Sequence, residues 1–245
     1  NSFFNVHCLR SVAVKFVDLD SEVRGSIPAS APPLPFPTCH AYDVDCLRRG
    51  LRTFFFLMDS KYFGMKQVDP AMLSSITVSF PEQQLDLRLR NLNVTGARWT
   101  RLIERRFNLS GGKSSVIFSS DLHLTADILM NLAGRFEPHW ARITMDIQDV
   151  ESNITYSWYG QKGIDKEDYL RIGQERIAVR NARTPTYFLQ PVTEESKEID
   201  GMLQMRPAIL DHLSNEITAS LMHTIVENFR LFALKVPVKF YYKYT

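Results

Sequence analysis

The chain has 245 residues, a length that suits one domain or two. Hydrophobic residues make up 44% of it and charged residues 23%, values that exclude a wholly disordered chain, a collagen-like repeat and a coiled-coil rod. The net charge of +2 is too small for the basic surface of a nucleic-acid-binding protein, so we expect no nucleic-acid partner.

Residues 1–34 are expected to form an N-terminal arm with a proline-rich linker, followed by one folded domain over residues 35–245. Residues 26–37 contain five prolines. Proline fixes φ and has no donor N–H, so this stretch is neither helix nor central strand. The chain begins with Asn1 and shows no basic-then-apolar leader, from which we expect a removed signal peptide or a fragment.

Two cysteines follow the linker. Cys39 and Cys46 are seven positions apart, a spacing that suits either a small disulfide-closed loop or a pair of metal ligands. Zinc sites of this kind normally need a second pair, which favours the disulfide. Cys8 is left over, either as a free thiol or in a segment that folds apart from the rest.

Residues 43–63 are predicted to form the first helix. Apolar residues recur there at helical spacing, from Val44 to Met58, with arginines on the other side. Asp43 is the expected N-cap and Gly64 the expected C-cap.

Residues 73–192 change to a period of two, typical of strands with one buried face. Residues 85–89 and 143–147 alternate cleanly, a turn is expected at 151–153, and the broken alternation over 116–124 suggests a β-bulge. Further turn signals lie at 110–112, 134 and 160–163. Since no helical pattern interrupts this region, we expect hairpins and an antiparallel sheet.

A long helix is predicted from Pro207 to Ala233, because apolar residues recur every three or four positions. At ~1.5 Å per residue it would be about 40 Å long. The sheet must then wrap around it, which gives an α+β fold.

Enzymatic motifs are lacking. The sequence has no dinucleotide-binding or serine-hydrolase motif, and Gly112-Lys113-Ser114 lacks the rest of a phosphate loop. His223 and Glu227 share a helix face as metal ligands would, but no third ligand is evident. We therefore expect no enzyme, no metal and no cofactor.

Three sequons favour a secreted protein, although the same residues would suit ordinary turns and strands. The predicted glycosylation sites are Asn93, Asn108 and Asn153.

The apolar content is high in aromatic residues, with 16 Phe, 9 Tyr and 3 Trp. It indicates either a solid aromatic core or an elongated apolar cavity between two apolar helices and a curved sheet.

Several motifs, in order, resemble the insect juvenile hormone-binding/takeout family. Its domain opens with a Pro-x-Cys and a second, helical Cys, found here as residues 37–39 and Cys46. A Gly and an Asp-Pro then precede the first strand, here Gly64 and residues 69–73, and an L-x-L-x-N-x-x-V-x-G strand follows at residues 87–96.

The resemblance extends to the end of the domain, where a long helix begins at a Pro, carries an Asn near its last turn and leads to a Val-Pro. The corresponding residues are Pro207, Asn228 and Val236-Pro237. The match runs from about Pro35 to Tyr242.

This resemblance implies a tubular lipid-binding fold and a secreted carrier, present in insect haemolymph, that binds a terpenoid, juvenile hormone-like ligand, fatty acid or carotenoid. We expect a monomer with an apolar tunnel. Tyr156 or Tyr169 would supply polar contacts. The predicted lining residues are Phe54, Phe55, Met58, Leu87, Leu89, Trp140, Met145, Leu213, Ile217, Leu221, Ile225 and Phe229.

Two alternatives remain open. One is a protein-interaction module whose tunnel is filled by side chains. The other is a membrane-surface lipid transfer module, less favoured, with a basic patch at Arg101, Arg105 and Arg106.

Overall fold

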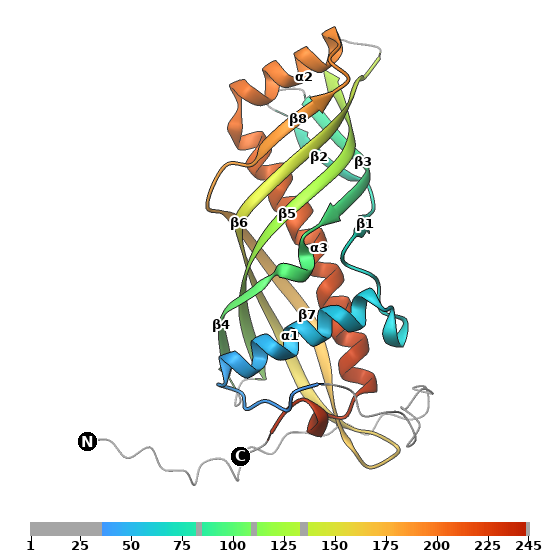
Figure 1. Cartoon of the computed structure of the whole chain (residues 1–245), viewed down its shortest axis with the longest axis vertical. Coiled ribbons are helices and arrows are strands. Elements are labelled where there is room, and N and C mark those ends of the chain that lie inside the picture. The colour runs from blue at the N-terminus through green and yellow to red at the C-terminus, as the bar shows by residue number, and fades with distance from the viewer. Residues whose placement is uncertain (1–35, 82–84, 109–111, 133–136, 244–245) are drawn as a thin grey trace, which may run out of the picture.

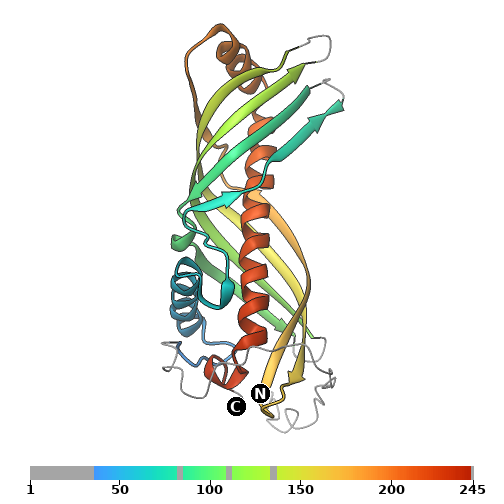
Figure 2. The same cartoon turned by 90° about the vertical axis from the view of Figure 1, so that its right-hand side faces the viewer.

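The computed structural model describes residues 36–81, 85–108, 112–132 and 137–243 (Figure 1). The predicted arm over residues 1–34, including Cys8, lies outside the described residues. In the described part, a twisted antiparallel sheet curves around one long helix without closing into a barrel (Figures 1 and 2). The predicted α+β class is therefore confirmed.

The helices are α1 (Val44–Asp59), α2 (Glu194–Met205) and α3 (Pro207–Lys235), with short 3₁₀ turns η2 (Tyr62–Gly64), η4 (Ala97–Trp99) and η5 (Val238–Phe240). The strands are β1 (Ala71–Leu73), β2 (Ile76–Phe80), β3 (Leu85–Thr95), β4 (Arg101–Asn108), β5 (Lys113–Leu132), β6 (His139–Lys162), β7 (Asp168–Asn181) and β8 (Thr186–Gln190). The sheet order is β1-β3-β5-β6-β7, with β2 on β3, β4 on β5 and β8 on β6.

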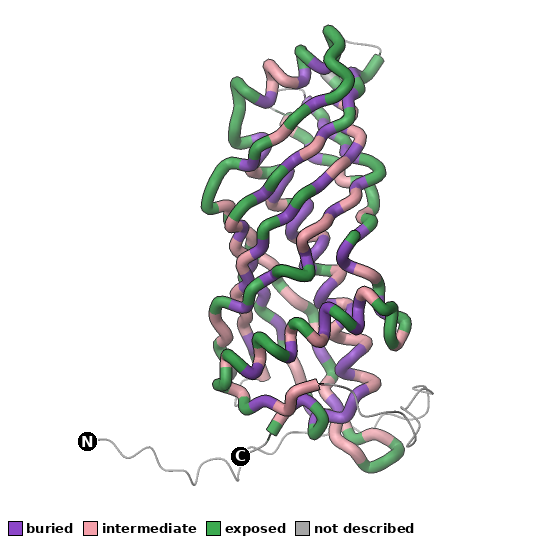
Figure 3. Tube along the Cα trace, viewed as in Figure 1, coloured by how far each residue is buried: buried purple, intermediate pink, exposed green. Residues whose placement is uncertain are grey.

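The strands show the alternation that the sequence predicts, with buried and exposed positions following one another along the sheet (Figure 3). The bulge expected within residues 116–124 lies on the partner strand instead: Gln148 and Asp149 of β6 together oppose Asp121 of β5, whose own alternation is unbroken. The expected turn at 151–153 is wrong, because β6 continues through it. Instead, Asp149 adopts a φ of 51°, and its N–H donates to Asp121 Oδ1 at 2.8 Å. A bulge therefore replaces the turn and resets which residues face inward.

Helix α1 begins as predicted, because Asp43 Oδ1 accepts from the N–H of Cys46 at 2.9 Å. It ends at Asp59, earlier than Gly64. Lys61 and Phe63 have φ values of 54° and 58°, which an α-helix does not accommodate, so Gly64 ends η2 instead. Cys39 and Cys46 form the disulfide, with Cα atoms 5.5 Å apart.

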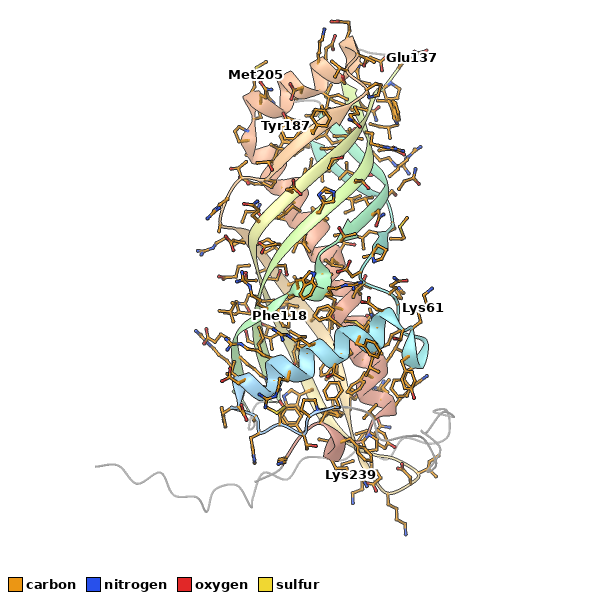
Figure 4. The ribbon with its side chains drawn as sticks, viewed as in Figure 1. Lys61, Phe118, Glu137, Tyr187, Met205 and Lys239 are labelled. Atoms are coloured by element: carbon orange, nitrogen blue, oxygen red, sulfur yellow. A yellow bond between two sulfur atoms is a disulfide. The ribbon has the colours of Figure 1, made fainter. Side chains whose placement is uncertain are left out.

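Helix α3 is confirmed and has 29 residues, so it is about 43 Å long at ~1.5 Å per residue. Its C-terminal half lies beside α1 and its N-terminal half adjoins α2 (Figure 2). We call these two parts of the molecule the α1 end and the α2 end. Figure 4 marks them, with Lys61 and Lys239 at the α1 end and Tyr187 and Met205 at the α2 end.

Helix α2 was not predicted. Only Ser196, Ile199 and Leu203 are buried along it, too short an apolar stripe to stand out in the sequence. Its N-terminus is fixed by a capping box between Thr193 and Ser196. None of the helices in the described part of the chain combines enough length with enough apolarity to cross a bilayer.

Candidate functional site

An apolar cavity of about 160 Å³ lies at the α1 end. Its walls come from α1, β4, β5, β6 and α3, and from the segments that precede α1 and follow η5. Almost all of the lining side chains are apolar or aromatic. Such a cavity is suited to an apolar guest, because it offers few hydrogen-bonding groups that would hold water.

Aromatic rings join the two helices across this cavity. Phe54 of α1 meets Phe229 of α3 edge-on, with ring centroids 6.0 Å apart, and meets Phe232 at 5.6 Å. Tyr156 of β6 contacts Phe229 from the other side at 6.1 Å. The helices and the sheet thus touch through ring edges, which leave gaps that aliphatic chains would fill.

The ends of the domain close the cavity. The ring of Phe36 packs on that of Phe232, with centroids 5.1 Å apart. It also lies against α1, since a Cβ added at Gly50 would be 3.3 Å from the Phe36 ring. The disulfide ties this segment to α1, and Cys39 pairs as a β-bridge with Tyr242. The Phe36–Phe232 contact and the Cys39–Tyr242 bridge were not visible in the sequence pattern, because each joins residues about 200 positions apart.

Three of the predicted lining residues, Phe54, Ile225 and Phe229, line this cavity, and so does Tyr156. Eight others are buried in the core without lining it: Phe55, Met58, Leu87, Leu89, Met145, Leu213, Ile217 and Leu221. The cavity is therefore shorter than the elongated tunnel expected from the sequence, and the interior toward the α2 end is packed with aliphatic side chains.

Trp140 lies outside the interior. It occupies an outward position of β6, between the inward-facing His139 and Ala141, and is 44% exposed. Tyr169 also lies away from the cavity, and its hydroxyl donates to Asp165 at 2.6 Å. Burial and this carboxylate raise the pKa of Tyr169, so it stays a neutral phenol at physiological pH.

Arg105 is the one charged residue among the described residues that line the cavity. The less favoured membrane-surface alternative needs it in an exposed basic patch with Arg101 and Arg106, but it lines the cavity. Its two neighbours in that patch face solvent and pair with acids: Arg101 lies 3.5 Å from Asp149, and Arg106 lies 2.6 Å from Glu104. The predicted basic patch is therefore not formed.

A second group of polar side chains joins α3 to β7. Glu175, His223 and Glu227 place their ligand atoms within 4.8 Å of one another, as a metal site would. Arg230 forms ion pairs with both glutamates, however, and its positive charge occupies the place that a cation would need. This cluster acts as a clamp between helix and sheet.

The ionisation of Glu175 reflects that clamp. Burial alone would raise its pKa, but hydrogen bonds from its own backbone N–H, from Arg230 and from His223 together outweigh burial. The pKa of Glu175 is therefore lower than its ordinary value, and its carboxylate is charged at neutral pH.

The predicted glycosylation sites lie on strands. Asn153 is exposed on β6 and accepts a hydrogen bond from Ser115 at 2.9 Å. Asn93 on β3 is half-buried. Asn108 ends β4, and its side chain lies outside the described part. All three stay predictions.

No protein-family model matches the sequence, but the chain is similar to a curated protein in sequence and to solved structures in fold. The chain is 23% identical over 160 residues to the juvenile hormone-binding protein of Manduca sexta, covering 64% of this chain and 69% of that protein. Its fold matches that of Takeout 1 of Epiphyas postvittana with a TM-score of 0.72 at 13% identity, over 85% of this chain and 100% of that one. The resemblance seen in the motifs is thus confirmed by sequence, and the takeout fold by structure.

Proposed function

We propose that this chain, similar in sequence to a juvenile hormone-binding protein and takeout-like in fold, is a secreted, non-enzymatic carrier of a small hydrophobic ligand. The observation that carries the proposal is the apolar cavity of about 160 Å³ between α1, α3 and the sheet. Phe54, Ile225 and Phe229 are the proposed contacts from the helices.

The size of the cavity limits what it holds without rearrangement. An apolar cavity of ~150 Å³ accommodates a single benzene-sized ring. The present one, at about 160 Å³, would take one ring or a short branched chain. A longer terpenoid, fatty acid or carotenoid would extend through an opening or displace aromatic side chains.

The expected affinity follows from apolar burial. A ligand that buries ~300 Å² of apolar surface gains about 7 kcal/mol at roughly 25 cal/mol per Å². This corresponds to micromolar binding before the loss of ligand freedom is subtracted. The name of the Manduca relative makes a juvenile hormone one candidate ligand.

Two features support the carrier role over catalysis and an intracellular role. The described residues that line the cavity include no Ser, His, Asp or Glu, the side chains that most often perform nucleophilic or acid–base chemistry. The disulfide between Cys39 and Cys46 is of a kind that persists in oxidising compartments outside the cytosol. Since one chain supplies the whole wall, we propose that it acts as a monomer.

The proposal is tested by filling the cavity. N-phenyl-1-naphthylamine, a neutral apolar fluorophore larger than the cavity alone, should place one ring there, extend through the opening and bind the wild-type protein with micromolar affinity. Val116→Phe places a ring in the cavity and should weaken binding about tenfold or more, since one side chain then occupies the ligand's volume.

Val192→Phe is the matched control, because Val192 is 73% exposed and lies in the loop between β8 and α2. It should bind the fluorophore as the wild type does. Absence of fluorophore binding to the wild type, or equal binding by the two Val→Phe variants, would contradict the proposal.

A further inference from the structure

We propose that Arg105 makes the cavity selective for amphiphilic organic acids, whose carboxylate pairs with its guanidinium while the apolar chain fills the remaining space. This inference rests on the proposed carrier function and names the ligand class more closely: a free acid is preferred to its neutral ester.

The position of Arg105 results from one extra residue in β4. Leu102 pairs with Phe118 of β5, Glu104 with Ile117 and Arg105 with Val116, so Ile103 has no opposite residue. Residues directly opposite each other in an antiparallel pair share a face. Arg105 therefore faces the same way as Val116, into the cavity, whereas Glu104 and Arg106 face away and pair with each other.

The surroundings of Arg105 are aromatic. Its guanidinium donates to the Tyr156 hydroxyl and lies over the ring of Tyr242, 5.0 Å from the centroid. Burial lowers the pKa of Arg105, partly offset by Tyr156. Arginine nevertheless stays protonated in proteins. Hence a positive charge sits in a cavity whose other described lining residues are uncharged.

The chemistry favours a carboxylate in this position. Guanidinium and carboxylate match in a planar, two-pronged arrangement of charge-assisted hydrogen bonds, stronger than a contact with a neutral phenol or ester. Exclusion of water by the aromatic walls strengthens the attraction. The Tyr156 hydroxyl, already beside the guanidinium, would donate a further hydrogen bond to the same carboxylate.

Dodecanoic acid and methyl dodecanoate form a matched pair of ligands for the test, since they differ in charge but share the same chain. Each displaces N-phenyl-1-naphthylamine from the wild type, and the ratio of their dissociation constants is measured. The acid should bind about tenfold or more tightly than the ester, the usual worth of a charge-assisted hydrogen bond.

Arg105→Met removes the charge and keeps an apolar side chain of similar length. In this variant the ratio of the two dissociation constants should fall to about one. The dissociation constant of the ester should stay within about twofold of its wild-type value. Arg105→Lys keeps the charge but loses the planar fork, so its ratio should be intermediate. If Arg105→Met does not fold, shown by loss of the circular dichroism spectrum, Arg105→Gln takes its place.

Equal binding of acid and ester by the wild type would overturn this inference, and so would a preference for the acid that persists in Arg105→Met. A merely structural role for Arg105 would weaken both ligands alike and leave the ratio unchanged. When the neutral fluorophore and the ester bind but the acid has no advantage, only this inference fails. When the fluorophore does not bind at all, the proposed carrier function fails with it.

Discussion

The two ends of the molecule have interiors of different composition. At the α2 end, aliphatic residues such as Leu87, Ile143 and Leu213 have no exposed surface and fill the space between α3 and the sheet. At the α1 end, Phe229 of the same helix meets Phe54 of α1 and Tyr156 of the sheet through ring edges, and a cavity of about 160 Å³ lies among them.

This difference follows from side-chain shape. Leu and Ile interdigitate at the density of organic crystals, whereas rings held edge-to-face touch along their edges and leave space beside their faces. In this molecule the cavity lies where the rings meet edge-on. We call the α2 end solid and the α1 end hollow, and four sets of substitutions test this difference.

The largest effect is expected from Leu213→Ala at the solid end. It should lower the free energy of unfolding by about 3 kcal/mol, because a close-packed site leaves a new cavity. Leu102→Ala, which enlarges the existing cavity, should lower it by only about 2 kcal/mol. Urea unfolding followed by circular dichroism measures both free energies. Equal losses in the two variants would argue against a difference in packing between the two ends. Fluorophore binding should change in Leu102→Ala alone.

The disulfide lies at the hollow end. Replacing Cys39 and Cys46 together by Ser should lower the free energy of unfolding by about 2 kcal/mol, because the unfolded chain is no longer closed into a small loop. Fluorophore binding should weaken too, since Cys39 lines the cavity. Dithiothreitol should lower the free energy of unfolding of the wild type but leave that of the double variant unchanged. If dithiothreitol also destabilised the double variant, the effect in the wild type could not be assigned to the disulfide.

Asn228 connects α3 to the segment after α1 at the hollow end. This buried side chain accepts from the N–H of Lys66 at 2.8 Å and donates to its carbonyl oxygen at 2.7 Å. Asn228→Ala leaves both backbone groups without this partner, so we expect a loss of about 2 kcal/mol in thermal or urea unfolding. Glu216→Ala, exposed on the same helix, is the control and should change stability little.

The smallest effect concerns the clamp between α3 and β7. The folded pKa of Glu175 lies below its ordinary value of 4.5, so its stabilisation is present above that value and is lost as pH falls through the folded pKa. Glu175→Gln should lower stability by about 1 kcal/mol at pH 7. The difference in stability between variant and wild type should shrink as pH falls below the ordinary pKa and vanish below the folded pKa of Glu175. A difference that stays constant as the pH is lowered would count against this role.

Much of the fold was predictable because its signals are local and repeated. The apolar stripe of α3 and the alternation in β3 and β6 each extend over many residues. The same stripes led to Ile225 and Phe229, which face the cavity. Helix α2, with few buried residues, gave no comparable signal.

The rest of the site depends on features that periodicity does not contain. Trp140 was misplaced because adjacent strand residues face opposite sides, so an error of one position moves a side chain from inside to outside. Arg105 was not predicted in the cavity because the extra residue at Ile103 reverses that alternation. Phe36 and Tyr242 reach the cavity through pairing between the two ends of the domain, which no local pattern reveals.

That pairing has a mechanical consequence. The N–H of Cys39 donates to the carbonyl of Tyr241 at 3.1 Å, and the N–H of Lys243 donates to the carbonyl of Cys39 at 3.0 Å. Tension applied across the two ends of the described chain would load these two hydrogen bonds first. On the N-terminal side, the disulfide at Cys39 would transmit the force directly to α1. Stretching would therefore open the cavity wall formed by Cys39, Tyr241 and Tyr242 while the aliphatic α2 end stayed folded.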